Sequence, residues 1–322
     1  MQTRPVEKIK IGTRGSPLAL KQTDMVSQAL RAVRPDLEIA VEIIKTSGDW
    51  KPSDGEVPLS AQNGGKAQFA KEIEAAMLRG DIDIAVHSMK DMESFLHDDL
   101  VIPWMLPRED ARDALICGDL AKNSQKIHDL PMGCRVGSAS VRRGAFIRAL
   151  RPDLKVEPFR GNVQTRLQKL KSGQVDVTLL AVAGLNRLGI ANEMSAIIPV
   201  EDMLPACAQG AVGIELRKDM LDELSFIGQI SCEKTVACVS AEREVLRALV
   251  GSCHTPVGAY AIWDGNEIFL RAQVCSLDGQ RSFKAEGRKV ITEPGDAVAL
   301  GADIGQALKQ KTPDDVLAEI MG

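Results

Sequence analysis

One cysteine that could take part in covalent chemistry lies in a segment of small and turn-forming residues, Gly251-Ser252-Cys253-His254-Thr255-Pro256. Glycine, serine and proline favour a loop, and a thiol exposed on a loop can act as a nucleophile or an attachment point. The adjacent His254 suggests a Cys/His protease, but neighbours in sequence rarely face each other and no oxyanion-hole signature accompanies them. We therefore expect Cys253 to be a nucleophile or a covalent anchor.

An aspartate follows an apolar strand in the segment His87-Ser88-Met89-Lys90-Asp91. Ligands of open α/β sheets bind at the carboxyl edge of the strands. A carboxylate placed there can accept N–H hydrogen bonds or stabilise a developing positive charge. The alternative is an Asp91 that caps the next turn, and spacing alone leaves both interpretations open.

Two turns rich in glycine and serine, Gly12 to Ser16 and Gly137 to Ser140, each connect a strand to a helix. Free N–H groups and the helix dipole favour an anion at such a position. A single turn of this kind is an ordinary β–α connection with a serine cap. Both turns, however, carry arginine at or beside the helix start, Arg14 in the first and Arg142-Arg143 in the second, and this favours anion binding.

Arginine is concentrated in the middle of the chain although the net charge is −4. A local cluster in an acidic protein suits a small polyanion bound in a cleft. Arg160 and Arg166 again follow a strand, and Arg187 is flanked by apolar residues. We expect three further cations to be solvated surface residues: Arg148, Arg151 and Lys169.

Composition excludes several classes of protein. The net charge argues against nucleic-acid binding. No apolar run approaches the roughly 20 residues of a membrane span, and the polar N-terminus lacks the apolar core of a signal peptide, so we expect a cytoplasmic protein. The seven cysteines include no CxxC pair, and the four histidines lack zinc-like spacing. We expect reduced thiols, mostly buried, and no metal site.

Hydrophobic periodicity predicts two successive α/β blocks and a different C-terminal third. In the first block we expect strands over 8–11, 37–45 and 82–86, and helices over 18–32 and 67–79. In the second we expect strands over 135–136, 155–157 and 177–182, and helices over 141–150 and 163–170. Parallel sheets with right-handed crossovers follow from this alternation. The last third predicts a helix over 241–250, hairpin strands over 257–263, 267–275 and 281–286, and helices from about 296 and 313.

Taken together, the motifs resemble the porphobilinogen deaminase (hydroxymethylbilane synthase) family. They occur in family order, and the ordered set is far more specific than any one of them. Besides the Cys253 loop and the His87–Asp91 segment, the resemblance rests on Ile11–Leu20, Val141–Arg143, Arg160–Val163, Thr165–Leu167, Leu180–Leu185 and Gln209–Gly213.

The resemblance implies an enzyme of tetrapyrrole biosynthesis, a transferase that works as a monomer. A dipyrromethane cofactor is bound to Cys253 through a thioether. Four porphobilinogen units are joined to it with loss of ammonia, and water then releases hydroxymethylbilane. Arginine suits this substrate because it stays charged when buried and binds carboxylates through paired hydrogen bonds.

The resemblance also assigns roles to individual residues. Asp91 is the catalytic aspartate, which stabilises cationic pyrrole species. The residues that bind the cofactor are Cys253, Ser88, Lys90, Ser138, Ser140, Arg142, Arg143, Arg160 and Gly161. Those that bind substrate are Arg14, Ser16, Lys66, Arg166, Arg187 and Gln209.

The fold implied is two doubly wound α/β lobes, like those of periplasmic binding proteins, and a small α+β C-terminal domain with a three-stranded antiparallel sheet. Domain 1 comprises residues 1–108 and 209–230, domain 2 residues 109–208, and domain 3 residues 231–322. The polar segment 49–64 reads as a mobile lid.

The sequence departs from the family pattern at several positions, none of which removes Asp91, Cys253 or the arginines. The departures are Met92-Glu93, Ala67-Gln68 after Gly65-Lys66, Ala139, Cys207-Ala208 and Ser252. A competing interpretation is a two-lobed solute-binding or sensor protein without catalysis, because fold alone does not separate the two classes. Intact mass separates them, since a binding protein carries no covalent pyrrole.

Overall fold

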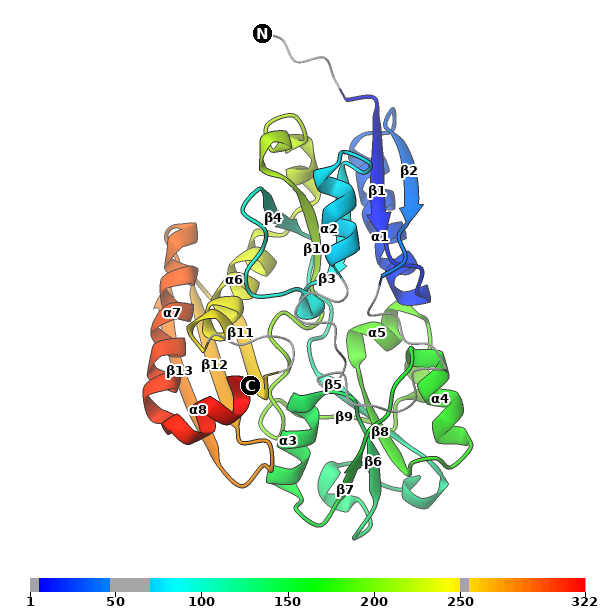
Figure 1. Ribbon diagram of the computed structural model, residues 1–322, viewed down its shortest axis with the longest axis vertical. Coiled ribbons are helices and arrows are strands. Elements are labelled where there is room, and N and C mark those ends of the chain that lie inside the picture. The colour runs from blue at the N-terminus through cyan, green and yellow to red at the C-terminus, as the bar shows by residue number, and fades with distance from the viewer. Residues whose placement is uncertain (1–5, 47–69, 250–254, 322) are drawn as a thin grey trace. The chain divides into compact units, whose positions relative to one another are not determined.

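The computed structural model describes residues 6–46, 70–249 and 255–321, which form two compact units. Unit 1 comprises the described residues up to 109 together with 211–236, and unit 2 comprises 110–210 and the described residues from 237 onward. Cys253, Lys66 and the whole of the 49–64 segment with its expected lid lie outside the described residues. Figure 1 shows the helices and strands of both units.

Unit 1 is built on one five-stranded sheet with the strand order β2-β1-β3-β10-β4. Its elements in chain order are β1 (Lys8–Thr13), α1 (Pro17–Val33), β2 (Glu38–Ile43), α2 (Lys71–Leu78), β3 (Ile84–Ser88), η3 (Met89–Asp91), β4 (Leu100–Met105), β10 (Val212–Arg217), η7 (Lys218–Met220), η8 (Ser225–Ile230) and the start of α6 (Glu233–Ala248).

Helices cover both faces of this sheet. Successive side chains of a strand point to opposite faces, so neighbouring residues of β3 belong to different hydrophobic cores. Ile84 and Val86 of β3 pack in one hydrophobic core with α1 and η8. Ala85, between them, packs in the other core with Ile73 and Met77 of α2. The sheet therefore has the two-sided cover expected of an α/β lobe.

Unit 2 contains a second five-stranded sheet with the order β7-β6-β8-β5-β9. The elements around it are β5 (Asp113–Cys117), η4 (Asp119–Ala121), η5 (Ile127–Asp129), β6 (Arg135–Gly137), α3 (Val141–Leu150), β7 (Lys155–Glu157), α4 (Val163–Lys171), β8 (Val177–Ala181), α5 (Val182–Arg187), η6 (Ala191–Glu193) and β9 (Ala196–Ile197). Leu115 and Leu179 pack with Phe146 of α3 on one face, and Ala114 and Leu180 pack with α4 and α5 on the other.

The C-terminal part of unit 2 is a three-stranded antiparallel sheet covered by helices, as expected. Its elements are α6, β11 (Val257–Asp264), β12 (Glu267–Cys275), β13 (Ser282–Val290), α7 (Pro294–Lys311) and α8 (Asp314–Met321). One face of the sheet packs with the helices in a shared core. Tyr260 and Cys275 belong instead to the core around Phe146 of α3, so this sheet also packs on the preceding part of unit 2.

The expected parallel pairing is present between β1 and its neighbours β2 and β3, and between β6 and its neighbours β7 and β8, but both five-stranded sheets are mixed. β10 runs antiparallel to β3 and β4, and β5 runs antiparallel to β8 and β9. Residue 210 is the last of its unit-2 segment, and β10 belongs to the unit-1 segment that follows it. A strand that enters a sheet without a crossover helix is free to run in the opposite direction.

Candidate active site

In unit 1, the two predicted site segments lie at the same edge of the sheet. β1 and β3 are parallel neighbours, with Ile11 opposite Ile84, so the residues that follow both strands meet at their carboxyl ends. Ser16 is the N-cap of α1, and its Oγ accepts a hydrogen bond from the amide of Ala19 at 3.3 Å. Arg14, beside it, is half-buried.

Asp91 lies at this edge, three residues beyond the end of β3, and is partly exposed together with Ser88 and Lys90. The short helix η3 that carries it is closed by main-chain bonds, in which the amide of Met92 donates to the carbonyl of Met89 at 3.3 Å. Among the described residues, no hydrogen bond to the Asp91 carboxylate is present. Within the described part of the chain, the Asp91 carboxylate is therefore not a cap of this turn.

A buried hydrogen-bonded pair of side chains behind this edge was not predicted from the sequence. His87 Nε2 lies 2.8 Å from Glu215 Oε2, and Glu215 is fully buried. The pair joins neighbouring strands β3 and β10, which are 128 residues apart in sequence. The only local signal was a charged residue in the apolar run Val212-Gly213-Ile214-Glu215-Leu216.

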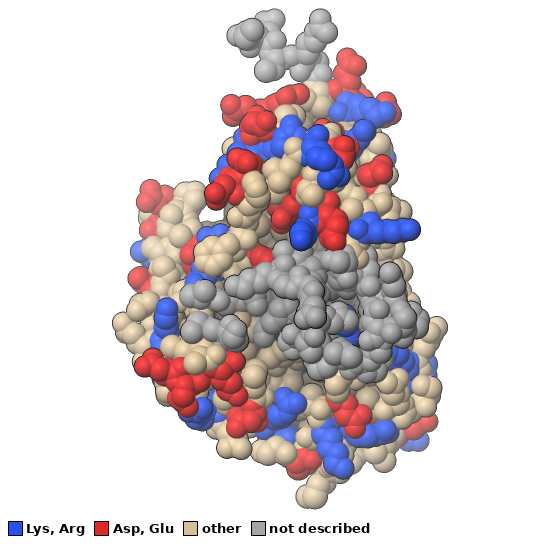
Figure 2. Space-filling model, in the orientation of Figure 1, with Lys and Arg blue, Asp and Glu red and all other residues tan. Residues whose placement is uncertain are grey.

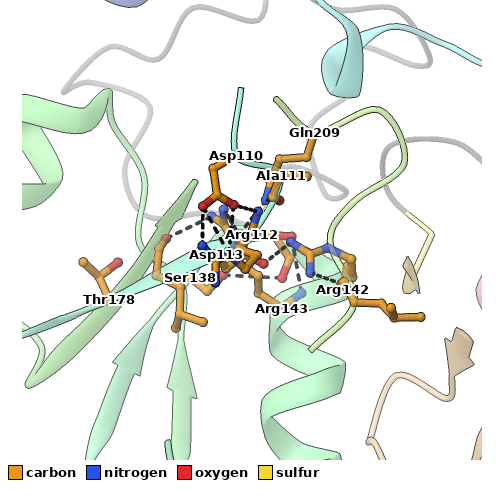
Figure 3. A network of polar contacts seen from close by, with 12 residues as sticks. Asp110, Ala111, Arg112, Asp113, Ser138, Arg142, Arg143, Thr178 and Gln209 are labelled. Atoms are coloured by element: carbon orange, nitrogen blue, oxygen red, sulfur yellow. Dashed lines mark hydrogen bonds and ion pairs between the residues drawn. The ribbon is translucent and has the colours of Figure 1, made fainter. Parts of the chain in front are cut away.

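In unit 2, Arg142 and Arg143 come from the first turn of α3 and point toward Asp113 at the start of β5 (Figure 3). Arg142 donates from Nη2 to Asp113 Oδ2 at 2.7 Å and from Nη1 to the carbonyl of Leu204 at 2.7 Å. Arg143 donates to Asp113 Oδ1 from Nε and Nη2, and from Nη1 to the carbonyl of Leu179 at 2.9 Å. Both arginines are buried.

Asp113, which the sequence analysis did not single out, is thus the centre of the arginine cluster. Burial by itself raises the pKa of this fully buried carboxyl, but Arg142, Arg143 and the amide of Gln209 together hold the pKa below its ordinary value. Gln209 Nε2 donates to Asp113 Oδ1 at 3.0 Å and to the carbonyl of Ala111 at 2.7 Å. The only sign of this role in the sequence was a charged residue, Asp113, at the start of the apolar segment Asp113–Cys117.

The remaining predicted residues of unit 2 lie around the same sheet edge, because β6, β7 and β8 are parallel. Ser138 Oγ accepts from the amide of Ser140 at 3.1 Å, and Ser140 is the N-cap of α3. Arg160, after β7, is buried, and Gly161 has a φ of 120°, which favours glycine.

Two further arginines predicted to bind substrate belong to this unit as well. Arg166 lies half-buried in the first half of α4. Arg187 ends α5, and its Nη2 donates to the carbonyl of Gly210 at 2.7 Å. Arg187 is therefore attached to the segment that carries Gln209.

The expectation of a solvated surface residue is wrong for Arg151, whose side chain is 16% exposed, whereas Arg148 and Lys169 are partly exposed. Arg151 donates to the carbonyls of Ile127, His128 and Leu130 and pairs with Asp153 at 2.7 Å. Arg148 donates to the carbonyl of Leu277, and Lys169 donates to that of Arg160. Their long side chains reach carbonyls of neighbouring segments, which sequence spacing does not reveal.

The described cysteines are free thiols, and burial makes several of them poor nucleophiles. Burial raises the pKa of Cys207 to about 12 and that of Cys134 to about 11, and it also raises the pKa of Cys117 and Cys275. A thiol is reactive as its thiolate.

The described part of the chain contains no group of three or more His, Cys, Asp or Glu side chains arranged for a metal ion. None of its helices is long and apolar enough to cross a membrane. On the face drawn in Figure 2, basic and acidic side chains are interspersed over the surface.

Comparison with known proteins decides the family. The family profile "Porphobilinogen deaminase, dipyromethane cofactor binding domain" matches residues 9–224, and the profile of the C-terminal domain matches residues 236–310. The chain is 45% identical over 306 residues to porphobilinogen deaminase of Nitrobacter hamburgensis, covering 94% of this chain and 92% of that one. The chain belongs to the porphobilinogen deaminase family.

A second relative, the chloroplastic porphobilinogen deaminase of Oryza sativa, is 46% identical over 315 residues, which cover 95% of this chain and 84% of that one. The activity of this chain is accordingly porphobilinogen deaminase (hydroxymethylbilane synthase) activity in tetrapyrrole biosynthesis, with a dipyrromethane cofactor. This family membership sets aside the alternative of a solute-binding protein without catalysis.

Among solved structures, the periplasmic aliphatic sulphonate-binding protein of Escherichia coli has a TM-score of 0.42 and 14% identity, with 98% of this chain and 78% of that chain covered.

The residues of a porphobilinogen deaminase must hold a cofactor that carries carboxylate side chains, and the arginine cluster fits this requirement. Arg142 is 3% exposed, and its Nε has no hydrogen-bond partner among the described residues. A buried N–H group of this kind is rare and is completed by an acceptor such as a carboxylate. The cluster also keeps one positive charge in excess of Asp113, which suits an anionic group.

Proposed function

We propose that the reaction is carried by Asp91 together with the arginines of unit 2, and that Cys253 anchors the cofactor through a thioether. The observation that carries the proposal is the Asp91 carboxylate at the end of β3, which no described residue engages by a hydrogen bond. When bound, the dipyrromethane supplies the pyrrole carbon to which four porphobilinogen units are joined, before water releases hydroxymethylbilane.

Asp91 acts where positive charge develops. Loss of ammonia from porphobilinogen leaves a cationic pyrrole species with polarised N–H groups. A fixed, ionised carboxylate beside those nitrogens stabilises the charge as it forms and accepts their hydrogen bonds, which lowers the barrier. Lys90, next to Asp91, and Ser88 supply hydrogen-bond donors for the cofactor at the same edge.

The cationic and hydroxyl residues hold carboxylates. Arg142, Arg143 and Arg160 are buried, so their interactions with an acetate or propionate group are shielded from water and strengthened. Ser138, Ser140 and Gly161 contribute to the cofactor site. We assign substrate binding to Arg14, Ser16, Lys66, Arg166, Arg187 and Gln209.

The anchor assignment is supported by contrast with the other cysteines. The raised pKa values of Cys117, Cys134, Cys207 and Cys275 keep these thiols protonated near neutral pH. Cys253 stands in a segment of Gly, Ser and Pro, a composition typical of a loop.

We further propose three domains, with bounds at 1–108 and 209–230, 109–208, and 231–322. Unit 2 contains the sheets of the proposed second and third domains, whereas residues 231–236 of the third domain belong to unit 1. We expect the protein to be a cytoplasmic monomer that binds porphobilinogen and neither nucleic acid nor membrane. Size-exclusion chromatography with light scattering tests the monomer.

The anchor is tested by intact mass and peptide mapping. Wild-type protein should carry a covalent pyrrole adduct on Cys253, and Cys253→Ser should be folded but free of it, because a hydroxyl is a far weaker nucleophile than a thiolate. Cys232→Ser serves as the matched control, since Cys232 is a partly exposed thiol, and it should retain the adduct. An adduct mapped to another cysteine would refute the assignment.

A further inference from the structure

The turn that carries Gln209 contains a strained residue. Ala208 has a φ of 62°, and it is the only non-glycine residue with a positive φ in the described part of the chain. An L-residue with a side chain is disfavoured in this region because its Cβ crowds the backbone. Such a conformation persists only where the surroundings hold it in place.

A single buried carboxylate holds this turn. Glu242, in the middle of α6, is fully buried. Its Oε2 accepts a hydrogen bond from the amide of Ala208 at 2.6 Å, and its Oε1 accepts one from the amide of Ala261 in β11 at 2.8 Å. The carboxylate thus joins the strained turn to the C-terminal sheet, and both bonds are charge-assisted.

The turn at Ala208 contacts the arginine cluster through the two residues that follow it. Gln209, the residue after Ala208, donates to Asp113, which in turn receives Arg142 and Arg143. Gly210, the next residue, accepts a hydrogen bond from Arg187 at its carbonyl. A continuous set of hydrogen bonds therefore runs from Glu242 through the turn to the guanidinium groups.

We propose that Glu242 is a positioning residue for pyrrole binding, because its carboxylate holds the turn at Ala208 that places Gln209 against Asp113 and its two arginines. The inference rests on the proposed carboxylate-binding role of these arginines. Glu242 belongs to the helix that precedes Cys253 in sequence, so the same helix leads to the anchor and supports the cluster.

A glutamine cannot replace this carboxylate. Its one oxygen can accept from the amide of Ala208 or from that of Ala261, and its NH₂ group would then face the other N–H donor. Glu242→Gln should therefore release the turn, and Ala208 should leave its positive φ. Gln209 and Asp113 then lose their fixed geometry, and the arginines hold carboxylates less well.

Three variants test the proposal: Glu242→Gln, the double variant Glu242→Gln/Ala208→Gly, and Glu244→Gln. Glu244 lies on the same helix and pairs with Arg247, so it controls for the substitution itself. The measurements are KM and kcat for porphobilinogen, and hydrogen exchange of peptides covering 206–211. Intact mass reports pyrrole loading in each variant.

Glu242→Gln should raise KM about tenfold, the effect of one charge-assisted hydrogen bond, with a smaller change in kcat. Exchange over 206–211 should be faster. Ala208→Gly should restore most of the KM in the double variant, because glycine adopts the positive φ without the carboxylate. Glu244→Gln should behave like wild type.

Unchanged exchange and KM in Glu242→Gln would overturn the proposal. So would a loss that Ala208→Gly does not restore, since it would mean that Glu242 acts on the fold at large and not on the turn. Wild-type protein without a pyrrole on Cys253 would instead contradict the proposed function. The exchange of the 206–211 peptides separates these cases because it does not depend on the pyrrole.

Discussion

Arg143 donates two hydrogen bonds to one oxygen of Asp113, from Nε at 3.1 Å and from Nη2 at 2.7 Å. Arg142 occupies the other oxygen at 2.7 Å. One buried carboxylate thus neutralises only one of the two guanidinium charges. The cluster of Asp113, Arg142 and Arg143 keeps a net charge of +1. Asp113 orders the arginines and reduces the cost of burying them.

Ionised Asp113 should make the free energy of unfolding depend on pH in the acidic range. Its pKa is lower in the folded protein than the ordinary value of about 3.9, so its contribution is fully present above that value and is lost as the pH falls toward the folded pKa. Asp113→Asn should destabilise unit 2 by about 3–5 kcal/mol at pH 7, because it leaves two buried cations unbalanced. Urea unfolding between pH 7 and pH 3 measures both effects.

The Asp113→Asn variant should also show a flatter decline of stability below pH 4 than wild type. Asp264→Asn is the control, because Asp264 is exposed and forms a surface pair with Arg288. Equal acid sensitivity in wild type and Asp113→Asn would contradict the role of Asp113.

The two arginines should differ in what they contribute. All three side-chain nitrogens of Arg143 donate to protein oxygens, which leaves only its second Nη hydrogens for a carboxylate, whereas the Nε of Arg142 has no hydrogen-bond partner among the described residues. Arg143→Lys should therefore mainly lower stability, and Arg142→Lys should mainly weaken pyrrole binding, by about tenfold or more for a charge-assisted contact.

Thermal unfolding and the occupancy of the covalent pyrrole, read from intact mass, separate the two effects. Arg281→Lys, at an exposed ion pair with Asp315, should change neither. If the two cluster variants behave alike in both measurements, the division of roles between Arg142 and Arg143 is wrong.

Asp91 should be needed for its charge and not only for its hydrogen bonds. Asp91→Asn keeps the size of the side chain, and the rate of the chemical step should fall about 100-fold or more, while binding of substrate carboxylates persists. Asp91→Glu should retain part of the activity, because the charge survives in a shifted position. Single-turnover rates and mass spectra of enzyme-bound oligopyrroles measure the effect.

Asp99→Asn, at an exposed position in the same segment, is the control for Asp91. An Asp91→Asn enzyme that turns over at a near-normal rate would exclude electrostatic stabilisation by this carboxylate.

Gly213 should be required for the packing of the segment that carries Asp91. A Cβ at Gly213 would lie 2.1 Å from Sδ of Met89, which is 1% exposed, and 2.9 Å from Cγ2 of Ile102. Gly213→Ala should cost about 1–3 kcal/mol through overpacking and displace η3. Adding Met89→Ala should recover part of this loss, whereas Gly295→Ala, with space around it, should have little effect.

Thermal unfolding and single-turnover rates report on stability and on the position of Asp91. Gly213→Ala with unchanged stability would show that Met89 moves aside freely.

Local periodicity was sufficient for elements whose pattern lies within a short window. The helix α3 (Val141–Leu150) and the strands β7 (Lys155–Glu157) and β12 (Glu267–Cys275) match the expected bounds. Expected elements with shifted bounds include α6, which begins at Glu233 and not at residue 241. The strands β4, β5 and β10 were not anticipated.

The strand β10 could not be predicted from the sequence because its position depends on the tertiary structure. An apolar run such as Val212–Arg217 can be a buried strand or part of a helix, and length alone does not decide. Its place between β3 and β4, antiparallel to both, depends on the return of the chain to unit 1.

The sequence by itself determined the family, the α/β architecture and the types of residue available at the sheet edges, because motif order and hydrophobic spacing are local properties. Only the tertiary structure decided what those residues contact. Asp113 lies 29 and 30 residues from its two arginines, and Glu242 lies 34 residues from Ala208. The low dielectric of the interior penalises an unpaired buried charge, so packing brings oppositely charged groups together. The residue spacing along the chain does not show which groups will pair.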